Sequence, residues 1–179
     1  MEGGSGALLF VVVHELLVLA ILLWIGRIRK WSPATFGLRV SWELTGTGIL
    51  LAFCVALVAG VAASVLSVLN PGGWNVPAHG GITLLTILLV SLINPVFEEF
   101  TELGYVVYSL QRFGIGFALC ASVCLRGLLH AYGGFNAVLL NGMIGLVLAL
   151  TYWRLRQLWP PIVAHSIINF VSLIPLMHS

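Results

Sequence analysis

Long apolar runs separated by short polar loops make up most of the chain. Six such runs are present, at residues 7–25, 45–69, 82–111, 117–130, 137–153 and 160–179. A transmembrane α-helix needs about 20 predominantly apolar residues, and pairs of Gly or Pro mark several of the breaks between the runs. The pattern therefore predicts about six transmembrane helices.

The third run contains a proline, Pro95, and is still predicted to be helical throughout. Apolar residues keep helical spacing from Phe97 to Leu110, beyond the proline. Proline lacks a backbone N–H and kinks a helix when it lies in the interior. We therefore expect either one kinked helix from about Ile82 to Gln111 or core helices that are broken and re-entrant.

Composition excludes an ordinary soluble protein. The 179 residues are 60% hydrophobic and 8% charged, whereas soluble domains have about 25% charged residues. We predict an all-α, polytopic membrane helix bundle that forms one integral membrane domain over residues 1–179. Residues 1–81 would supply two spans and their loops, and residues 82–179 the functional core. The net charge of +2 gives no indication of nucleic acid, so the predicted partner is the lipid bilayer.

The basic residues predict the orientation of the bundle. Seven of the eight lie in three alternate loops, at Arg27, Arg29, Lys30, Arg39, Arg112, Arg154 and Arg156. Loops rich in Lys and Arg face the cytoplasm by the positive-inside rule. Loops 26–44, 111–116 and 154–160 are therefore predicted to be cytoplasmic, and both termini to lie outside.

Three acids, Glu98, Glu99 and Glu102, lie within the apolar third run. A carboxylate inside a bilayer costs about 2.5 to 3.5 kcal/mol on insertion scales, so such residues usually mark a working site. Repulsion between the adjacent glutamates suits one of them to accept and return a proton near neutral pH, as a general base does. The alternative is that these acids are solvated at a helix end and have no role.

Four other polar residues lie in the predicted spans as two helix-face pairs. Arg126 and His130 are spaced i, i+4, and so are His165 and Asn169. One such histidine alone is as often structural as catalytic. Together with the glutamates, however, the set contains a base, groups that orient water or polarise a carbonyl, and an amide donor for an oxyanion. Hydrolysis of a peptide bond within a membrane requires these groups.

These motifs resemble those of a known family. Glu98-Glu99, His130 and His165-x-x-x-Asn169 after a Trp-Pro-Pro opening are similar to the CPBP family of intramembrane proteases, also called the Abi or CAAX-protease and bacteriocin-processing family. The resemblance extends to the basic stretch 29–39 and to the stretch 142–164. It implies a hydrolase that carries out intramembrane proteolysis of a membrane-anchored or lipidated substrate, and we expect it in a prokaryotic cell membrane.

The resemblance also implies a role for each site residue. Glu98, with Glu99 beside it, would activate water, His130 and His165 would assist or hold the water, and Asn169 would stabilise the oxyanion. We predict no cofactor, because a metal-free glutamate mechanism is argued for the family. The alternative is a divalent metal at Glu98, His130 and His165. The substrate stays open among a prenylated C-terminus, a bacteriocin leader and a C-terminal sorting anchor.

The chain departs from the family pattern at two positions. Leu103 stands where the family has an Arg, and Arg126 stands where it has an aromatic residue. We hypothesise that Arg126 replaces the missing cation and holds Glu99 or Glu102, which leaves Glu98 freer to act as a base. Two alternatives remain: a degenerate member that acts as an immunity or scaffold protein, and a small transporter that relays protons through the buried acids.

Several other residues carry weaker expectations. His14-Glu15 begins like a zinc-protease signature, but Val18 occupies the position of the second histidine, so packing or support of the site is predicted instead. The three cysteines are predicted to be small core residues, and His79 and His178 are given no role. The five catalytic candidates are expected to converge on one water-accessible cavity between the third, fourth and sixth helices, because a shared wet cavity satisfies all of them.

Overall fold

The computed structural model describes residues 3–75 and 82–177, and all of its regular elements are helical. The longer helices are α1 Gly3–Ile28, α2 Trp42–Leu69, α3 Leu84–Glu99, α5 Ile115–Leu129, α6 Phe135–Leu155 and α7 Trp159–Leu173. Shorter helical turns are η1 Pro33–Phe36, the π-helical η2 Phe100–Val107, α4 Tyr108–Leu110, η3 Gln111–Phe113, η4 Ala131–Gly133 and η5 Ile174–Met177. The predicted all-α helix bundle is confirmed. His79 and His178 lie outside the described residues.

Within residues 3–75 and 82–177, five helical stretches are long and apolar enough to cross a membrane. They are Ser5–Ile28, Trp42–Leu69, Leu84–Phe113, Phe135–Leu155 and Trp159–Met177. The chain is therefore an integral membrane protein. The fourth predicted helix, α5, is a shorter apolar helix of 15 residues, about 22 Å at 1.5 Å per residue, against a hydrocarbon core of about 30 Å. Glycines with positive φ, Gly114 and Gly134, flank the segment that contains it.

One continuous helix runs from Leu84 to Phe113 through α3, η2, α4 and η3. Of the two predicted alternatives, one helix across Pro95 or broken helices, the structure shows the first. Pro95 lies inside α3 and lacks the N–H that an α-helix would use to bond the carbonyl of Ser91. The helix then widens into the π-helical η2, a feature that often accompanies functional sites. The first turn of this π-helical segment carries Glu102.

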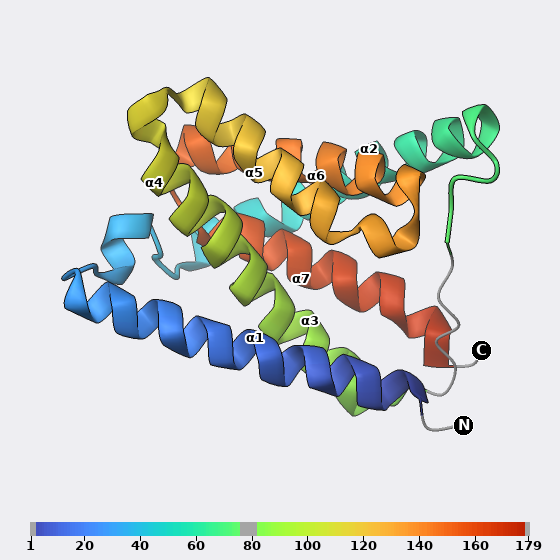
Figure 1. Cartoon of the computed structure of the whole chain (residues 1–179), viewed down its shortest axis with the longest axis horizontal. Coiled ribbons are helices and arrows are strands. Elements are labelled where there is room, and N and C mark those ends of the chain that lie inside the picture. Colours follow the sequence, from blue (N-terminus) through green and yellow to red (C-terminus); the bar gives the residue numbers. More distant parts are fainter. Residues whose placement is uncertain (1–2, 76–81, 178–179) are drawn as a thin grey trace.

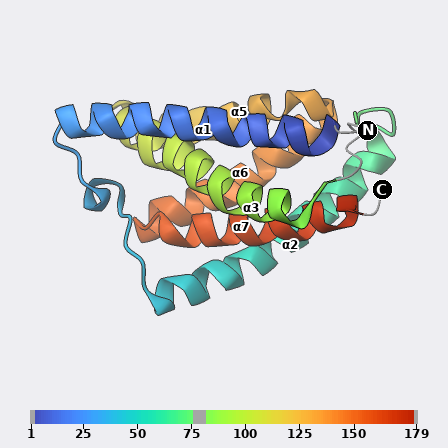
Figure 2. The ribbon, with the colours of Figure 1, turned by 90° about the horizontal axis from the view of Figure 1, so that it is seen from below.

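Most of the helices lie roughly along one long axis, whereas α3 crosses α1 obliquely, and α1 and α2 lie on opposite faces of the bundle (Figures 1 and 2). α3 packs against both α1 and α7, α5 packs against α6, and α2 packs against α6 and α7. α1 begins and α7 ends at the same end of the bundle (Figure 1). The loops that carry the seven basic residues lie at the opposite end, which we call the basic end. Which end faces the cytoplasm stays a prediction.

Loops at the end opposite the basic end are joined through a buried asparagine, Asn136, at the start of α6. Its backbone N–H donates to Gly73 O at 2.9 Å, and its side-chain Nδ2 donates to Asn70 O at 2.8 Å. Asn75 N–H donates to Gly133 O at 2.8 Å. The loop after α2 is therefore fixed to the loop between α5 and α6, and this holds the ends of these helices together.

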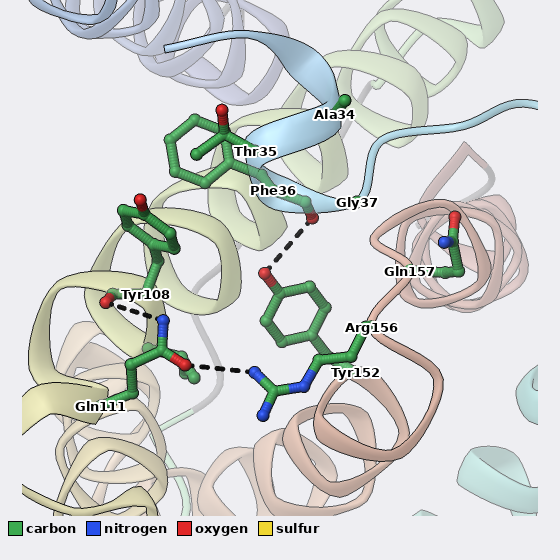
Figure 3. Close-up of a pocket in the computed structure, with 10 residues that line it drawn as sticks. Ala34, Thr35, Phe36, Gly37, Tyr108, Gln111, Tyr152, Arg156 and Gln157 are labelled. Carbon is green, nitrogen blue, oxygen red and sulfur yellow. Dashed lines mark hydrogen bonds between the residues drawn. The ribbon is translucent and has the colours of Figure 1, made fainter. Parts of the chain in front are cut away.

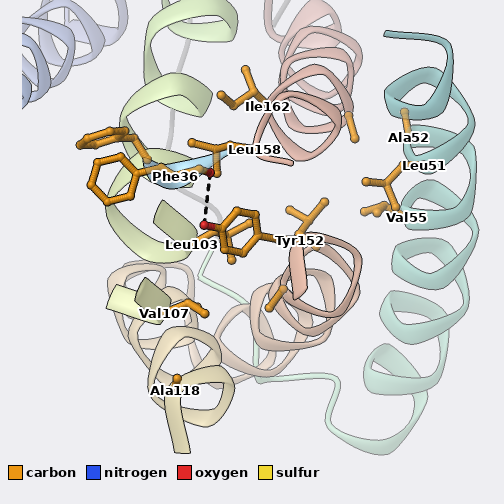
Figure 4. Packing of buried hydrophobic residues seen from close by; sticks show 14 residues of the cluster. Phe36, Leu51, Ala52, Val55, Leu103, Val107, Ala118, Tyr152, Leu158 and Ile162 are labelled. Atoms are coloured by element: carbon orange, nitrogen blue, oxygen red, sulfur yellow. Dashed lines mark hydrogen bonds between the residues drawn. The ribbon is translucent and has the colours of Figure 1, made fainter. Parts of the chain in front are cut away.

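A cluster of buried apolar side chains joins α2, α6 and α7 to the long helix (Figure 4). Leu103, Leu148 and Leu158 are fully buried in it. The three cysteines do not belong to this core: Cys54, Cys120 and Cys124 are free and exposed, so their prediction as core residues was wrong. Apolar runs in a membrane protein supply both the core and the lipid-facing surface, and composition does not separate the two.

Candidate active site

Three acidic side chains are buried where α3 passes into η2. Glu98 and Glu99 end α3, and Glu102 lies in the first turn of η2. Their exposed fractions are 9%, 0% and 1%. An isolated carboxylate in such an environment would be strongly unfavourable, so the neighbouring helices must supply partners.

Arg126 of α5 is the cation that faces all three acids. Its Nη2 lies 2.5 Å from Glu99 Oε1 and its Nε lies 2.6 Å from Glu102 Oε2, whereas its Nη1 lies 3.9 Å from Glu98 Oε2. The contacts expected of Arg126 are therefore present, with both Glu99 and Glu102. Leu103, which stands in place of the family arginine, is fully buried in the apolar core instead.

Two glycines allow α5 and α6 to approach closely enough to bury Arg126. A Cβ added at Gly145 of α6 would lie 2.7 Å from Arg126 Cδ, and one added at Gly127 would lie 2.9 Å from Val138 O. Small residues at helix contacts are typical of membrane bundles because they let backbones approach. Here they let the stem of the arginine lie directly against α6.

His165 of α7 is the second partner of Glu99. Its Nδ1 lies 2.7 Å from Glu99 Oε1, the same oxygen that Arg126 contacts. Glu99 is thus held from two helices at once, α5 and α7. The two adjacent glutamates therefore differ. Among the described residues, Glu98 has one cation within 4 Å, the Nη1 of Arg126 at 3.9 Å.

A chain of amides connects Glu98 to α1 and α7. Asn94, one turn before Glu98, donates from Nδ2 to Glu98 Oε1 at 2.8 Å and to Glu15 Oε1 at 2.6 Å. Its Oδ1 accepts from Asn169 Nδ2 at 2.8 Å. Glu15 is buried, with 4% of its surface exposed. Asn94 therefore joins three helices, and each of its partners is polar.

His130 lies at the C-terminal end of α5 and is the least engaged of the candidates. Its Nδ1 bonds the backbone carbonyl of Arg126 at 2.9 Å, and its ring stacks on Tyr132 with centroids 6.0 Å apart. None of the carboxylates in residues 3–75 and 82–177 lies within ion-pair distance of it. If the bonded Nδ1 carries the proton, Nε2 is the acceptor.

The structure thus brings Glu98, Glu99, His165 and Asn169 into one network with Arg126 and Glu102, and places His130 at its edge. It adds Glu15 and Asn94. Of these two, only Glu15 was predicted to pack against the site or support it. The signals were present: Glu15 is an acid within an apolar span, and Asn94 is four residues before Glu98. What was missing was the packing of α1 on α3.

The described side chains do not form a group of three or more His, Cys, Asp or Glu residues placed to hold a metal ion. His165 is paired with Glu99, and the Nδ1 of His130 is used by a backbone carbonyl. A hydrogen bond from Nδ1 to a carbonyl or carboxylate is also how a metal-bound histidine is usually oriented, so the absence of a cofactor stays a prediction.

These features define a polytopic membrane protein with a buried cluster of acids, histidine and amides. The sequence model of the family described as type II CAAX prenyl endopeptidase Rce1-like matches residues 80–171, more than half of the chain. The chain belongs to this family, as its motifs indicated. The matched segment contains every predicted site residue. No curated protein and no solved structure matches the chain.

Proposed function

We propose that the chain is an intramembrane endopeptidase in which Glu98 activates the attacking water. The difference between Glu98 and Glu99 supports this assignment. Glu98 Oε2 has no hydrogen-bond partner among the described residues, and Glu98 retains some exposed surface. Glu99 also has one unpartnered oxygen, but its side chain is fully buried and held by Arg126 and His165. A general base needs a carboxylate oxygen within about 2.6 to 3.2 Å of the water.

In the proposed reaction Glu98 takes a proton from water, and the water oxygen attacks the carbonyl carbon of the scissile peptide bond. Asn169 stabilises the oxyanion of the tetrahedral intermediate, because its Nδ2 gives one hydrogen to Asn94 and retains a second. The proton held by Glu98 then passes to the amide nitrogen, and the C–N bond breaks. His130 offers Nε2 to the water or the substrate, while His165 positions Glu99.

The substrate is proposed to be a membrane-anchored or lipidated chain. Glu98 lies 14 residues after Leu84 and 15 before Phe113 in the continuous helix, so it is about 21 Å from either end at 1.5 Å per residue. A scissile bond at this depth must belong to a chain that is held at the membrane, which agrees with the prenyl endopeptidase description of the family.

Cleavage of lipidated peptides by the purified protein in nanodiscs tests this proposal, with products measured by mass spectrometry. Glu98→Gln keeps the shape of the side chain and removes the base, so we expect a loss in rate of about 10²- to 10⁴-fold. Glu43→Gln is the matched control, because Glu43 is an exposed acid at the start of α2. A Glu98→Gln variant that cleaves at the wild-type rate would contradict water activation by Glu98.

A degenerate, non-enzymatic member is the second candidate, and the position of Arg126 favours it. One guanidinium within 4 Å of all three acids neutralises part of their charge. For such a protein the wild type would cleave none of the prenylated, leader or sorting-anchor peptides, and Glu98→Gln would change only stability. The same purified variants, reconstituted in sealed liposomes and assayed for proton-coupled flux, test the transporter alternative.

A further inference from the structure

A second polar site lies at the basic end of the bundle, apart from the acid cluster. It is a pocket of about 310 Å³ between η1, the end of the long helix, and the turn from α6 to α7 (Figure 3). Its polar lining consists of Thr35, Tyr108, Gln111, Tyr152, Arg156 and Gln157. None of the predicted catalytic residues lines it.

Arg156 is the charged residue of this pocket, and no carboxyl group lines it. It ends α6 in a left-handed conformation with φ of 53°. Its Nη1 donates to Gln111 Oε1 at 3.2 Å, and Gln111 Nε2 in turn donates to Tyr108 O at 3.1 Å. Gln111 is the only side-chain partner that residues 3–75 and 82–177 give to this guanidinium. Its other N–H groups are therefore available to a ligand.

The walls of the pocket are fixed by backbone hydrogen bonds. Tyr152 OH donates to Phe36 O at 3.2 Å, and Leu158 N–H donates to Gly37 O at 3.0 Å. A Cβ at Gly37 would lie against the carbonyl of Arg156, so the loop after η1 lies directly against the α6–α7 turn. The site is preformed rather than assembled from loose side chains.

An open apolar pocket of about 340 Å³ lies beside it on α6, lined by Leu150, Thr151, Arg154 and Leu155. Tyr152 and Arg156 of the polar pocket are spaced i, i+4 and share one helix face. In the apolar pocket, Thr151 directly precedes Tyr152 and Leu155 directly precedes Arg156. The polar and the apolar pocket therefore lie on neighbouring faces of the same two helical turns. This pairing of an anion-binding group with apolar surface suits a molecule that has a charged head and an acyl chain.

We propose that the polar pocket binds the phosphate of an anionic glycerophospholipid, with an acyl chain against the apolar pocket of α6. Arginine is well suited to bidentate contacts with phosphate, and basic pockets between helices bind anionic head groups. Tyr108 and Trp31, whose rings are 6.2 Å apart, are the residue types that gather at head-group depth. This binding site goes beyond the proposed peptidase activity and does not depend on it.

Native mass spectrometry of the delipidated full chain, titrated with phosphatidylglycerol, tests the proposal. Asparagine tolerates the left-handed conformation, so Arg156→Asn removes the guanidinium with little backbone cost, and we expect the dissociation constant to rise about ten-fold or more. Arg112→Gln is the matched control, because Arg112 is an exposed cation of the same end, stacked on Phe113, and lines neither pocket. It should change the dissociation constant less than about two-fold, as an exposed charge does.

A second variant keeps the test decisive if Arg156→Asn fails to fold. Gln111→Leu leaves the cation and removes the oxygen that orients it, so binding should weaken about three-fold. Unchanged lipid binding in Arg156→Asn and in Gln111→Leu overturns the proposal, and so does an equal loss in Arg112→Gln. Displacement of the lipid by soluble glycerol phosphate at equal concentration indicates a site for free phosphate instead. Displacement by a peptide with a free C-terminal carboxylate, but not by its amide, indicates a peptide site.

Discussion

Two buried contact regions meet at α7 and are built in different ways. Towards α1, α3 and α5, α7 contributes His165 and Asn169 to the acid network. Ile162 and Ala164 of the same helix belong to the apolar core, and Ile162 lies one turn before His165 on the same helix face. On the α2 side the contact is close enough that a Cβ at Gly48 would lie 2.6 Å from Val163 Cβ. One helix therefore belongs to a polar and an apolar region at once.

The two regions differ in whether lipid can replace the contacts that a side chain makes in the folded protein. Acyl chains are as apolar as leucine, so a side chain in the apolar core gains mainly packing contacts when it leaves lipid. A carboxylate or guanidinium has no partner in lipid, and each polar atom of the acid network needs one from another helix. The acid network should therefore be sensitive to single changes, and the apolar core should tolerate them better.

Removal of Arg126 is expected to have the largest effect. Arg126→Leu leaves Glu99 and Glu102 buried without their cation, and breaking a buried ion pair in this way costs about 3 to 5 kcal/mol. Reversible unfolding in mixed micelles measures the loss, with Arg126→Lys as the control that keeps the charge. Wild-type stability and activity in Arg126→Leu would show that the acids do not need this partner.

A truncation in the apolar core should cost less. Leu148 is fully buried, and Leu→Ala changes cost about 2 to 5 kcal/mol in soluble cores. Part of that cost is transfer from water, which lipid removes, so we expect about 1 to 2 kcal/mol for Leu148→Ala in the same unfolding assay. Peptide cleavage per folded molecule should stay at the wild-type level. A loss of stability equal to that of Arg126→Leu would remove the distinction between the two regions.

Glu15 should show the smallest effect of the three, and mainly in activity. Glu15→Leu leaves one Asn94 N–H without an acceptor, worth about 1 kcal/mol, which corresponds to about a five-fold lower cleavage rate if Asn94 positions Glu98 and Asn169. Glu15→Gln retains an acceptor oxygen and is the control, with a rate within about two-fold of the wild type. Equal cleavage rates in Glu15→Leu and the wild type would show that the contact between Glu15 of α1 and Asn94 does not affect the reaction.

Much of the fold could be predicted because hydropathy in a membrane protein reports directly on the spans. The helix across Pro95 could be predicted from the apolar spacing of residues 97–110. The π-helical segment could not be predicted, because its widening depends on tertiary contacts. The predicted run at residues 117–130 matches α5 closely in length, but at 15 residues this helix is shorter than the five candidate spans.

The acid site could be predicted in part for an electrostatic reason. Arg126 is the one basic residue outside the loops, so its partners had to be the acids of another span, and the structure places it against Glu99 and Glu102. The contact between Glu15 and Asn94 has no such signature, because the crossing of α1 over α3 is not encoded in either segment alone. His130 was predicted at the site from its spacing and the family resemblance, and the structure places its Nδ1 on the backbone carbonyl of Arg126 and not on a carboxylate.

The burial of Arg126 has a consequence for how the chain enters the bilayer during synthesis. Arg126 lies in the last turn of α5. An arginine in an apolar helix opposes insertion by up to about 2.5 to 3.5 kcal/mol, and α5 has only 15 residues to offset that cost. We therefore expect α5 alone to insert poorly into the bilayer. The preceding long helix, which carries the acids, leaves the ribosome first and is available when α5 emerges. We expect the two to enter lipid together, as a hairpin about Gly114 whose charges are already paired.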